Sequence, residues 1–232
     1  SSKNVFYPGA APHQQAIPPL DHFLGELGVE SFALLGTDYV YPRTTNNILE
    51  SYLKSKGIAE EDIFVNYTPF GHSDWATIVS DVVALGATGK QVGVISTING
   101  DANVGFYKEL AAQNVSAADI PVVAFSVGEE ELSGLDTSNL VGHLAAWNYF
   151  QSADTPENAA FISAWHDYIG DTSRVTNDPM EAHYIGFNMW VNAVEAAGTT
   201  DVDAVREAMW GQEFPNLTGG MAVMNANHHL SK

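Results

Sequence analysis

The chain has 232 residues, of which 45% are hydrophobic and 16% charged, a composition typical of a globular protein with a substantial core. Its 9 basic and 28 acidic residues give a formal net charge of −19, which argues against binding to nucleic acid or to an anionic membrane surface. Cysteine is absent, which excludes disulfides, thiolate chemistry and cysteine-ligated zinc.

Between residues 31 and 147, short β-rich runs alternate with helical patterns. Strands are predicted at residues 31–36, 63–67, 91–96, 120–126 and 140–147. Helices are predicted at residues 45–56, 74–85 and 102–113, and Ser73 is placed to cap the second of them. This repetition predicts an α/β fold, in which right-handed crossovers build a parallel sheet flanked by helices on both faces.

The pattern changes after residue 147 and becomes mostly helical. Helices are predicted at residues 156–169, after a Thr155-Pro156 start signal, at residues 178–197, and at residues 201–210. The only strand predicted here is at residues 221–224. The helices have wide apolar faces that need a sheet to cover them, and only residues 4–7 are available for that. This imbalance predicts that the chain is part of a larger protein.

The loop at residues 36–43 carries aromatic rings, a carboxylate and an arginine directly after the first strand of the main repeat. Ligands bind at the carboxyl ends of strands in open parallel sheets. Tyr39 and Tyr41 can stack on a flat solute, and Asp38 or Arg43 can fix its dipole. The alternative is an ordinary turn, with both tyrosines packed on the next helix and Pro42 ending the loop.

Two later loops follow the third and fourth predicted strands, so all three loops should converge on one edge. In the first, Asn99 offers both a donor and an acceptor, and Asp101 accepts hydrogen bonds. In the second, Ser126 and Glu129 are ligand candidates, while residues 130–131 are interpreted as surface acids in the first turn of a helix. Turn and cap roles remain the alternative for all four candidates.

No motif in the sequence predicts chemistry, a metal or a cofactor. The His72-x-Asp74 spacing is explained more simply by a helix cap than by a metal site, and His228-His229 has no spaced carboxylate partner. Nothing matches a nucleophile elbow, a His-Glu-x-x-His helix or a glycine-rich phosphate loop. An amide hydrolase would need a nucleophile or a metal, so we predict that the protein is not an enzyme.

Six segments that span almost the whole chain resemble the urea-binding and short-chain-amide-binding branch of the type I periplasmic binding proteins. These segments are residues 5–15, 36–43, 67–75, 96–103, 125–130 and 178–184. The wider group includes the branched-chain amino acid receptors. The resemblance is closer to the urea receptors of ABC transporters than to the cytoplasmic amide sensors of the same fold.

The resemblance implies a two-lobed Venus-flytrap in which a solute binds between the lobes and hinge closure buries it. Residues 1–30 and 148–215 would form part of the first lobe, and residues 31–147 with 216–232 the second. Family members have a long stretch before Val5 that holds most first-lobe strands and many ligand contacts. Tyr41, and less directly Tyr39, would flank the solute, while the loops around Asn99–Asp101 and Ser126–Glu129 would supply polar contacts.

The function implied by this resemblance is capture of urea or a short amide for an ABC importer. The partners would be the permease subunits in the membrane. The protein would lie in the periplasm or be lipid-anchored at the outer face of the cytoplasmic membrane. The alternative is a cytoplasmic amide sensor that controls gene expression through the same closure. An upstream signal peptide or lipid-anchor cysteine would distinguish the receptor from the sensor.

Overall fold

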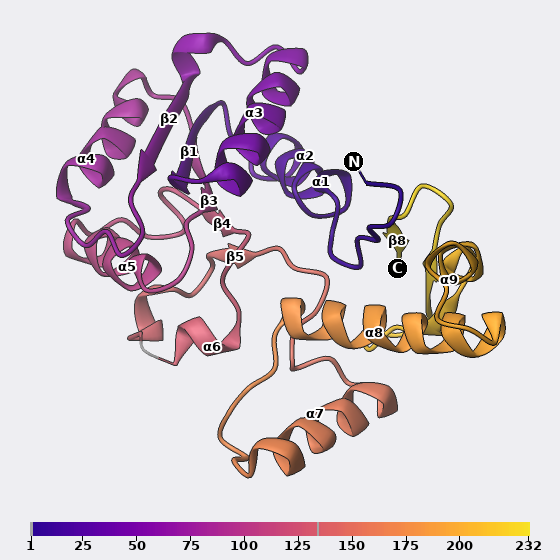
Figure 1. The fold of residues 1–232 in the computed structure, drawn as a ribbon. Coiled ribbons are helices and arrows are strands. Elements are labelled where there is room, and N and C mark those ends of the chain that lie inside the picture. The colour runs from indigo at the N-terminus through magenta and orange to yellow at the C-terminus, as the bar shows by residue number, and fades with distance from the viewer. Residues whose placement is uncertain (1, 134) are drawn as a thin grey trace. The chain divides into compact units, whose positions relative to one another are not determined.

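The computed structural model describes residues 2–133 and 135–232 and divides the chain into two compact units (Figure 1). One unit, Pro12–Trp147, is called the sheet unit. The other combines the segment that ends at Ala11 with Asn148–Lys232 and is called the helical unit. The chain therefore passes between the units after Ala11 and again after Trp147.

The sheet unit contains a five-stranded sheet in which every pairing is parallel. Its strands are β1 (Ser31–Thr37), β2 (Ile63–Thr68), β3 (Val92–Thr97), β4 (Val122–Ala124) and β5 (Leu144–Ala145). Their order in the sheet is β2-β1-β3-β4-β5. All five strands were predicted, although β4 and β5 are shorter than expected.

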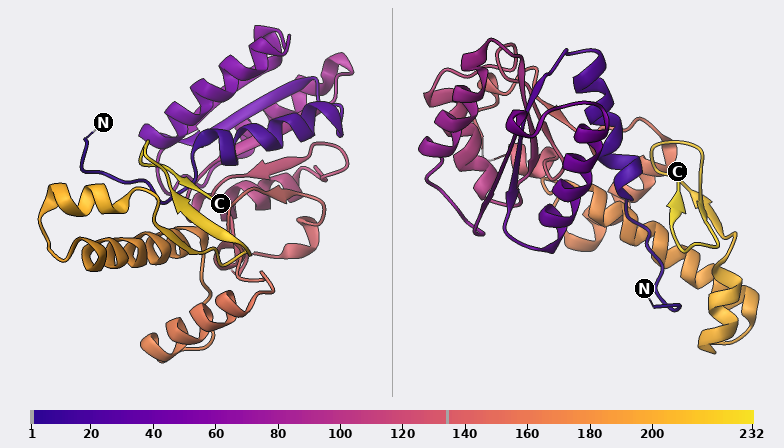
Figure 2. Two further views of the ribbon diagram at one scale, coloured as in Figure 1. Left: turned by 90° about the vertical axis from the view of Figure 1, so that its right-hand side faces the viewer. Right: turned by 90° about the horizontal axis from the view of Figure 1, so that it is seen from above.

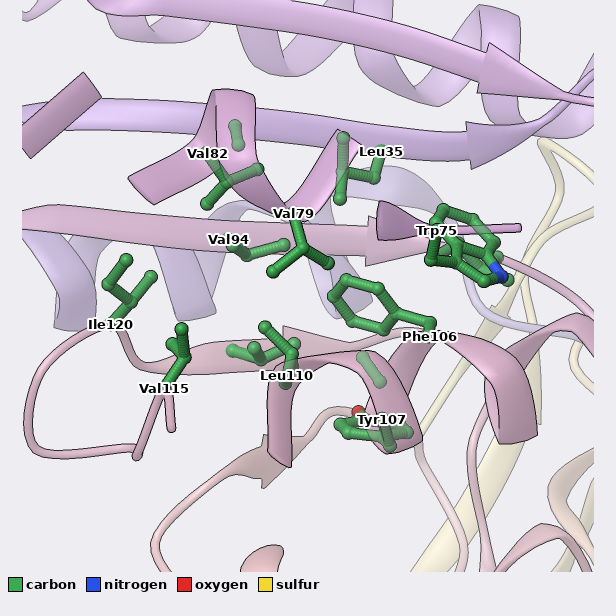
Figure 3. Packing of buried hydrophobic residues seen from close by; sticks show 14 of the residues in the cluster. Leu35, Trp75, Val79, Val82, Val94, Phe106, Tyr107, Leu110, Val115 and Ile120 are labelled. Atoms are coloured by element: carbon green, nitrogen blue, oxygen red, sulfur yellow. The ribbon is translucent and has the colours of Figure 1, made fainter. Parts of the chain in front are cut away.

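Helices cover both faces of this sheet. Successive β1 residues point to opposite sides, so they pack with different helices. Phe32 and Leu34 pack with α2 and α3 in one buried cluster, while Ala33 and Leu35 pack with α4 and α5 in another. Figure 3 shows the second cluster. The α-helices of the sheet unit are α1 (Pro12–Gln15), α2 (Ile17–Gly25), α3 (Val40–Ser55), α4 (Ala76–Leu85), α5 (Ala102–Ala112) and α6 (Glu129–Leu132). Its 3-10 helices are Glu60–Asp62, Gly86–Thr88 and Thr137–Asn139. The predicted parallel sheet flanked by helices is confirmed.

Two local predictions in this unit are wrong. The helix α3 begins at Val40, five residues before its predicted start, so the predicted loop at residues 36–43 is partly helical. Ser73 does not cap α4, whose N-cap is Trp75 without a side-chain bond. The indole of Trp75 is buried, lies 5.3 Å from the ring of Phe106 and donates to the carbonyl of His72. The helix α4 therefore begins directly after a buried ring.

The helical unit has three α-helices and a small antiparallel sheet, which is drawn in yellow in Figure 2. Its elements are α7 (Pro156–Ile169), α8 (Asp178–Ala197), α9 (Val202–Met209), β6 (Glu213–Pro215), β7 (Met221–Met224) and β8 (Leu230–Ser231). The Thr155 hydroxyl accepts the Asn158 amide proton at 3.1 Å, as its cap position predicted. Gly198 ends α8 with a φ of +65°, a conformation that favours glycine. The strands β6 and β8 were not predicted.

The core of the helical unit lies between α8, α9 and the small sheet, where Ile185, Met189 and Met224 are buried. Residues 4–7 do not form a strand, and only Tyr7 makes an isolated bridge to His229. Large side chains on α7 and α8 remain exposed. Tyr168, Phe187 and Trp190 are 87%, 63% and 46% exposed, respectively. The apolar faces noted in the sequence are thus only partly covered.

The two units differ from the predicted lobes at two places. Residues 12–30 lie in the sheet unit, because Leu20 and Phe23 of α2 pack into a cluster on the sheet. Residues 216–232 lie in the helical unit, because β7 pairs with β6 and β8 pairs with β7. The short strands near the end of the chain therefore belong to their own small sheet.

Candidate functional site

The predicted site residues follow three neighbouring strands at one edge of the parallel sheet. Tyr39 and Tyr41 follow β1, Asn99 and Asp101 follow β3, and Ser126 and Glu129 follow β4. In the sheet, β1 pairs with β3 and β3 pairs with β4, so the carboxyl ends of the three strands are adjacent. The chain reverses its direction of winding between β1 and β3, which is the place where α/β sheets bind ligands.

Hydrogen bonds between the strand ends hold this edge together. The Asp38 amide donates to the carbonyl of Thr68 at 2.7 Å, and the Asn99 amide donates to the hydroxyl of Thr37 at 2.9 Å. Gly36 allows close packing here, because a Cβ at this position would lie 2.5 Å from Oγ1 of Thr97. The loops after β1, β2 and β3 are therefore positioned by the sheet itself.

Three aromatic rings lie next to one another after β1 and β2. The Tyr39 ring centroid is 6.1 Å from that of Tyr41 and 5.0 Å from that of Phe70. Tyr41 is half-buried and lies in the first turn of α3. Burial raises the pKa of the Tyr39 hydroxyl, so this group keeps its proton at neutral pH. Phe70 is 64% exposed and was missed by the sequence reasoning, although its position directly after a strand was a usable signal.

The charged pair of Asp38 and Arg43 stabilises this loop. The Nε of Arg43 donates to Asp38 at 2.6 Å, and the guanidinium lies 4.5 Å from the Tyr67 ring centroid. The hydrogen bond from Arg43 lowers the pKa of the Asp38 carboxyl. Each of the two groups thus has a partner within the protein, which weakens the idea that they bind the dipole of a solute.

Two asparagine side chains stabilise the loop after β3 by hydrogen bonds to backbone carbonyls. The Nδ2 of Asn99 donates to the carbonyl of Thr97 at 2.9 Å. Asn103 is buried and its Nδ2 donates to the carbonyls of Ile98 and Gly100 at 3.0 and 3.2 Å. Gly100 has a φ of +64°, which favours glycine at this turn. Asn103 is a positioning residue that the sequence did not reveal, because its helical position alone predicts nothing about its partners.

A hollow of about 330 Å³ opens between the loop after β3 and the α6 region. Its lining consists of Gly100, Asp101, Asn103, Val104, Glu130, Glu131 and Ser133. Glu131 also accepts the Gly128 amide proton at 2.8 Å, which is the helix-start role expected of these acids. Their location in the lining, however, differs from the interpretation of Glu130 and Glu131 as surface acids only. Ser126 and Glu129 are half-buried in the chain just before Glu130.

The loop after β4 is braced from two directions. Trp147 donates its indole proton to the carbonyl of Phe125 at 2.6 Å, and Gln15 donates to the same oxygen at 3.0 Å. Gln15 also donates to the carbonyl of Ala146 at 2.8 Å. A Cβ at Gly128 would lie 2.4 Å from the Trp147 ring, so the backbone must approach the indole closely. A rigid edge of this kind suits binding by preformed polar groups.

Residues 2–133 and 135–232 contain neither a candidate metal site nor a candidate membrane span. Within them, no group of three or more His, Cys, Asp or Glu side chains could hold a metal ion. No helix in these residues is long and apolar enough to cross a bilayer.

The family model described as a periplasmic binding protein domain matches residues 1–232. The chain belongs to the periplasmic binding protein family. A Leu/Ile/Val-binding protein homologue from Brucella melitensis is 25% identical over 167 residues, which cover 71% of this chain and 42% of that protein. A limonene hydroxylase from Geobacillus stearothermophilus is 31% identical over 91 residues, but the match covers only 39% of this chain and 16% of that protein.

Solved structures of solute-binding proteins share the fold. One from Rhodopseudomonas palustris, in complex with p-hydroxybenzoic acid, has a TM-score of 0.83 at 18% identity. The match covers 98% of this chain and 60% of that protein. A leucine-binding protein from Thermotoga maritima has a TM-score of 0.74 at 15% identity, and here 95% of this chain matches 60% of that protein.

These matches confirm the fold class and the wider group. The chain has the type I periplasmic binding fold of the branched-chain amino acid and ABC substrate-binding group. The family model that matches the chain describes binding proteins. The chain spans about 60% of the solved relatives' length and 42% of the Brucella relative.

Proposed function

We propose that the protein containing this chain is the solute receptor of an ABC importer and that its solute is urea or a short-chain amide. The observation that carries this proposal is the excess of acidic groups around the candidate site. The loops after β1 to β4, residues 38–43, 69–75, 98–101 and 125–131, contain two basic residues, Arg43 and His72, and six acidic ones. The acidic residues are Asp74, Asp101, Glu129, Glu130 and Glu131, together with Asp38, which is paired with Arg43.

A site rich in acceptors favours a solute rich in N–H donors. Urea and short amides are flat and carry NH2 groups, each of which must find an acceptor when buried or lose roughly 1–3 kcal/mol. The rings of Tyr39, Tyr41 and Phe70 can cover the faces of such a solute. A carboxylate ligand would instead be favoured by a free cation, and Arg43 is already paired with Asp38. The acidic edge therefore supports a neutral amide over an aromatic acid.

The two crossings between the units support hinge closure as the mode of action. Hinge motion at the segments near Ala11 and Trp147 would close the protein on its solute, since a ligand that binds the closed state better shifts the population towards it. The closed receptor would then be bound by permease subunits in the membrane. This role places the protein in the periplasm or at the outer face of the cytoplasmic membrane. Cell fractionation tests the location, and recovery in the cytoplasm would instead favour an amide sensor.

The binding test uses calorimetry of the intact protein that contains this chain. Urea or acetamide should bind, and leucine and 4-hydroxybenzoate should not. Urea should also raise the melting temperature, and Tyr41→Ala should abolish most of that rise because it removes a ring from the site. Phe187→Ala in the helical unit is the control and should leave the rise unchanged. Tight binding of 4-hydroxybenzoate, or an unchanged response in Tyr41→Ala, would contradict the proposal.

A further inference from the structure

The chain leaves the sheet unit after Trp147, and the helical unit holds the next two residues through one carboxylate. The Oδ2 of Asp178 accepts the backbone proton of Asn148 at 2.7 Å and that of Tyr149 at 3.2 Å. Asp178 is the first residue of α8 and is only 8% exposed. Hydrogen bonds to an ionised acceptor are roughly twice as strong as neutral ones. The carboxylate therefore fixes the backbone from its first residue in the helical unit.

The side chain of Tyr149 and the charge of Lys232 support this attachment. Tyr149 is fully buried, and its hydroxyl donates to Oδ1 of Asn158 at 2.7 Å and lies 2.6 Å from Oγ1 of Thr176. Burial raises the pKa of the Asp178 carboxyl, whereas the positive charge of Lys232 and the two backbone protons oppose this rise. The start of the second crossing is thus held by both its backbone and a buried ring.

On the other side of the same crossing, the sheet unit holds the chain up to Trp147. The Ala146 amide donates to the carbonyl of Ala124 at 2.9 Å, and the Ala146 carbonyl accepts a proton from Gln15 at 2.8 Å. The indole of Trp147 donates to the carbonyl of Phe125 at 2.6 Å. A single peptide link therefore lies between the last residue held by the sheet unit and the first residue held by the helical unit.

The first crossing between the units is longer. On its helical side, the Tyr7 amide donates to the carbonyl of His228 at 2.8 Å. The next element in the chain is α1 of the sheet unit, which begins at Pro12. Residues 8–11 lie between these points, and nothing is within 4 Å of a Cβ placed on Gly9. Because each residue has soft backbone torsions, this segment can follow a motion that the shorter crossing defines.

We propose that the two units rotate about the link between Trp147 and Asn148 and that Asp178 is the positioning residue that holds this pivot. The peptide bond itself is planar, so the rotation falls on the adjacent torsions, first of all on ψ of Trp147. This inference rests on the proposed function, because it specifies the hinge by which the receptor would close on its solute. A loosened pivot should broaden the range of open states and reduce the fraction that can bind.

The first test lengthens each crossing of the intact protein by one glycine. One variant carries the glycine between Trp147 and Asn148, and the matched control carries it between Gly9 and Ala10. The first insertion separates the two anchors of the pivot, whereas the second lengthens a segment that already contains several soft torsions. The distribution of distances between the units should broaden in the first variant and change little in the control.

Spin labels measure this distribution. This chain has no cysteine, so Ser51→Cys in α3 and Ala196→Cys in α8 place one exposed label in each unit, in a background without other cysteines. Pulsed electron paramagnetic resonance then gives the distances in the absence of solute. The readout is therefore independent of which solute the protein binds.

The second test removes the carboxylate that holds the pivot. Asp178→Ala should broaden the distance distribution, and Asp178→Asn, which keeps an amide oxygen, should restore part of the original width. Asp171→Ala is the matched control, because Asp171 also accepts a backbone proton in the helical unit, from Ser173 at 2.8 Å, but lies outside the crossing. The apparent affinity for urea should fall about fivefold or more in Asp178→Ala and stay unchanged in the control.

The outcomes separate this inference from the proposed function. Equal broadening by the two glycine insertions, or none by the insertion after Trp147, would overturn the pivot. An unchanged distribution in Asp178→Ala would remove Asp178 from it. If that variant fails to fold, the insertions decide, since they delete no side chain. If the distances respond as expected but neither urea nor acetamide binds, the proposed function is wrong and the pivot stands.

Discussion

The sheet unit and the helical unit bury their apolar residues to very different degrees. In the sheet unit, helices cover both faces of a parallel sheet and two large clusters of side chains are buried. In the helical unit, α8 and α9 pack on three short antiparallel strands, while large rings on α7 and α8 stay exposed. Large exposed rings thus remain on helices of the unit that has only a small sheet.

The largest expected effect on stability comes from replacing one phenylalanine with alanine in each unit, which tests this contrast directly. Phe106→Ala, at a side chain that is 0% exposed, should lower the free energy of unfolding by about 3–5 kcal/mol through lost burial and a cavity. Phe187→Ala, at a side chain that is 63% exposed, should change it by about 0.5 kcal/mol or less. Calorimetric melting of the intact protein measures both. Equal losses would show that Phe187 is covered in the intact protein and would remove the contrast.

A smaller effect is expected at glycines that other residues approach closely. Gly36→Ala in the sheet unit should lower the free energy of unfolding by about 1–3 kcal/mol. The added Cβ would lie 2.5 Å from Thr97 and 2.8 Å from Pro42. Gly186→Ala in α8 should lower the free energy of unfolding by a smaller amount. Its Cβ would meet Pro8 at 2.9 Å, but alanine favours the helix by about 1 kcal/mol over glycine.

The control for both glycine variants is Gly25→Ala, since nothing lies within 4 Å of a Cβ at this position. Its melting temperature should be unchanged or slightly higher. If Gly36→Ala behaved like this control, the close packing between β1, β3 and α3 would not be essential. Calorimetric melting of the three variants under one condition makes the comparison.

The smallest effect concerns the pH dependence of stability, which has opposite signs at Glu181 and at Asp119. Burial raises the pKa of Glu181 in the helical unit, where its carboxylate pairs with Lys232. Its contribution to stability is therefore full below the ordinary glutamate pKa of 4.5 and is lost as the pH rises through the higher folded value. Glu181→Gln has no carboxyl that titrates, so it does not lose this stability as the pH rises. Its melting temperature relative to that of the parent should therefore increase with pH.

Asp119 in the sheet unit provides the opposite case. Hydrogen bonds from Ser116 lower the pKa of its carboxyl, so its contribution is present above the ordinary aspartate value of 3.8 and is lost as the pH falls. Asp119→Asn should therefore lower the melting temperature at pH values above 3.8. This effect should disappear as the pH falls through the lower folded pKa. Melting curves collected across the acid range compare the two variants. Parallel pH profiles for both would contradict the assigned directions.

The elements with strong local signals could be predicted from the sequence. The alternation of Phe32, Ala33, Leu34 and Leu35 between two clusters made β1 recognisable as a buried strand. The Thr155 cap and the terminal Gly198 defined the starts and ends of helices. The start of α4 could not be predicted, because the packing of Trp75 against Phe106 outweighs the preference of Ser73 for a cap.

The convergence of the candidate loops on one edge of the sheet was predictable from the sequence, but their side-chain contacts were not. Strand order brought the loops of Tyr39, Asn99 and Ser126 to one edge, as a parallel sheet requires. The contact of Phe70 with Tyr39 and the hydrogen bonds that Asn103 donates depend on side-chain directions. Such directions are set by neighbours that are distant in sequence, so no local pattern reveals them.

The sequence by itself determined the parallel α/β pattern, the Thr155 cap and the family, because each is encoded by periodicity or by motifs that neighbouring residues share. Only the tertiary structure decided which unit residues 12–30 and 216–232 join and which acids surround one hollow. The physical reason is that burial and electrostatic fields depend on distance in space, and the chain brings together residues that its order keeps apart.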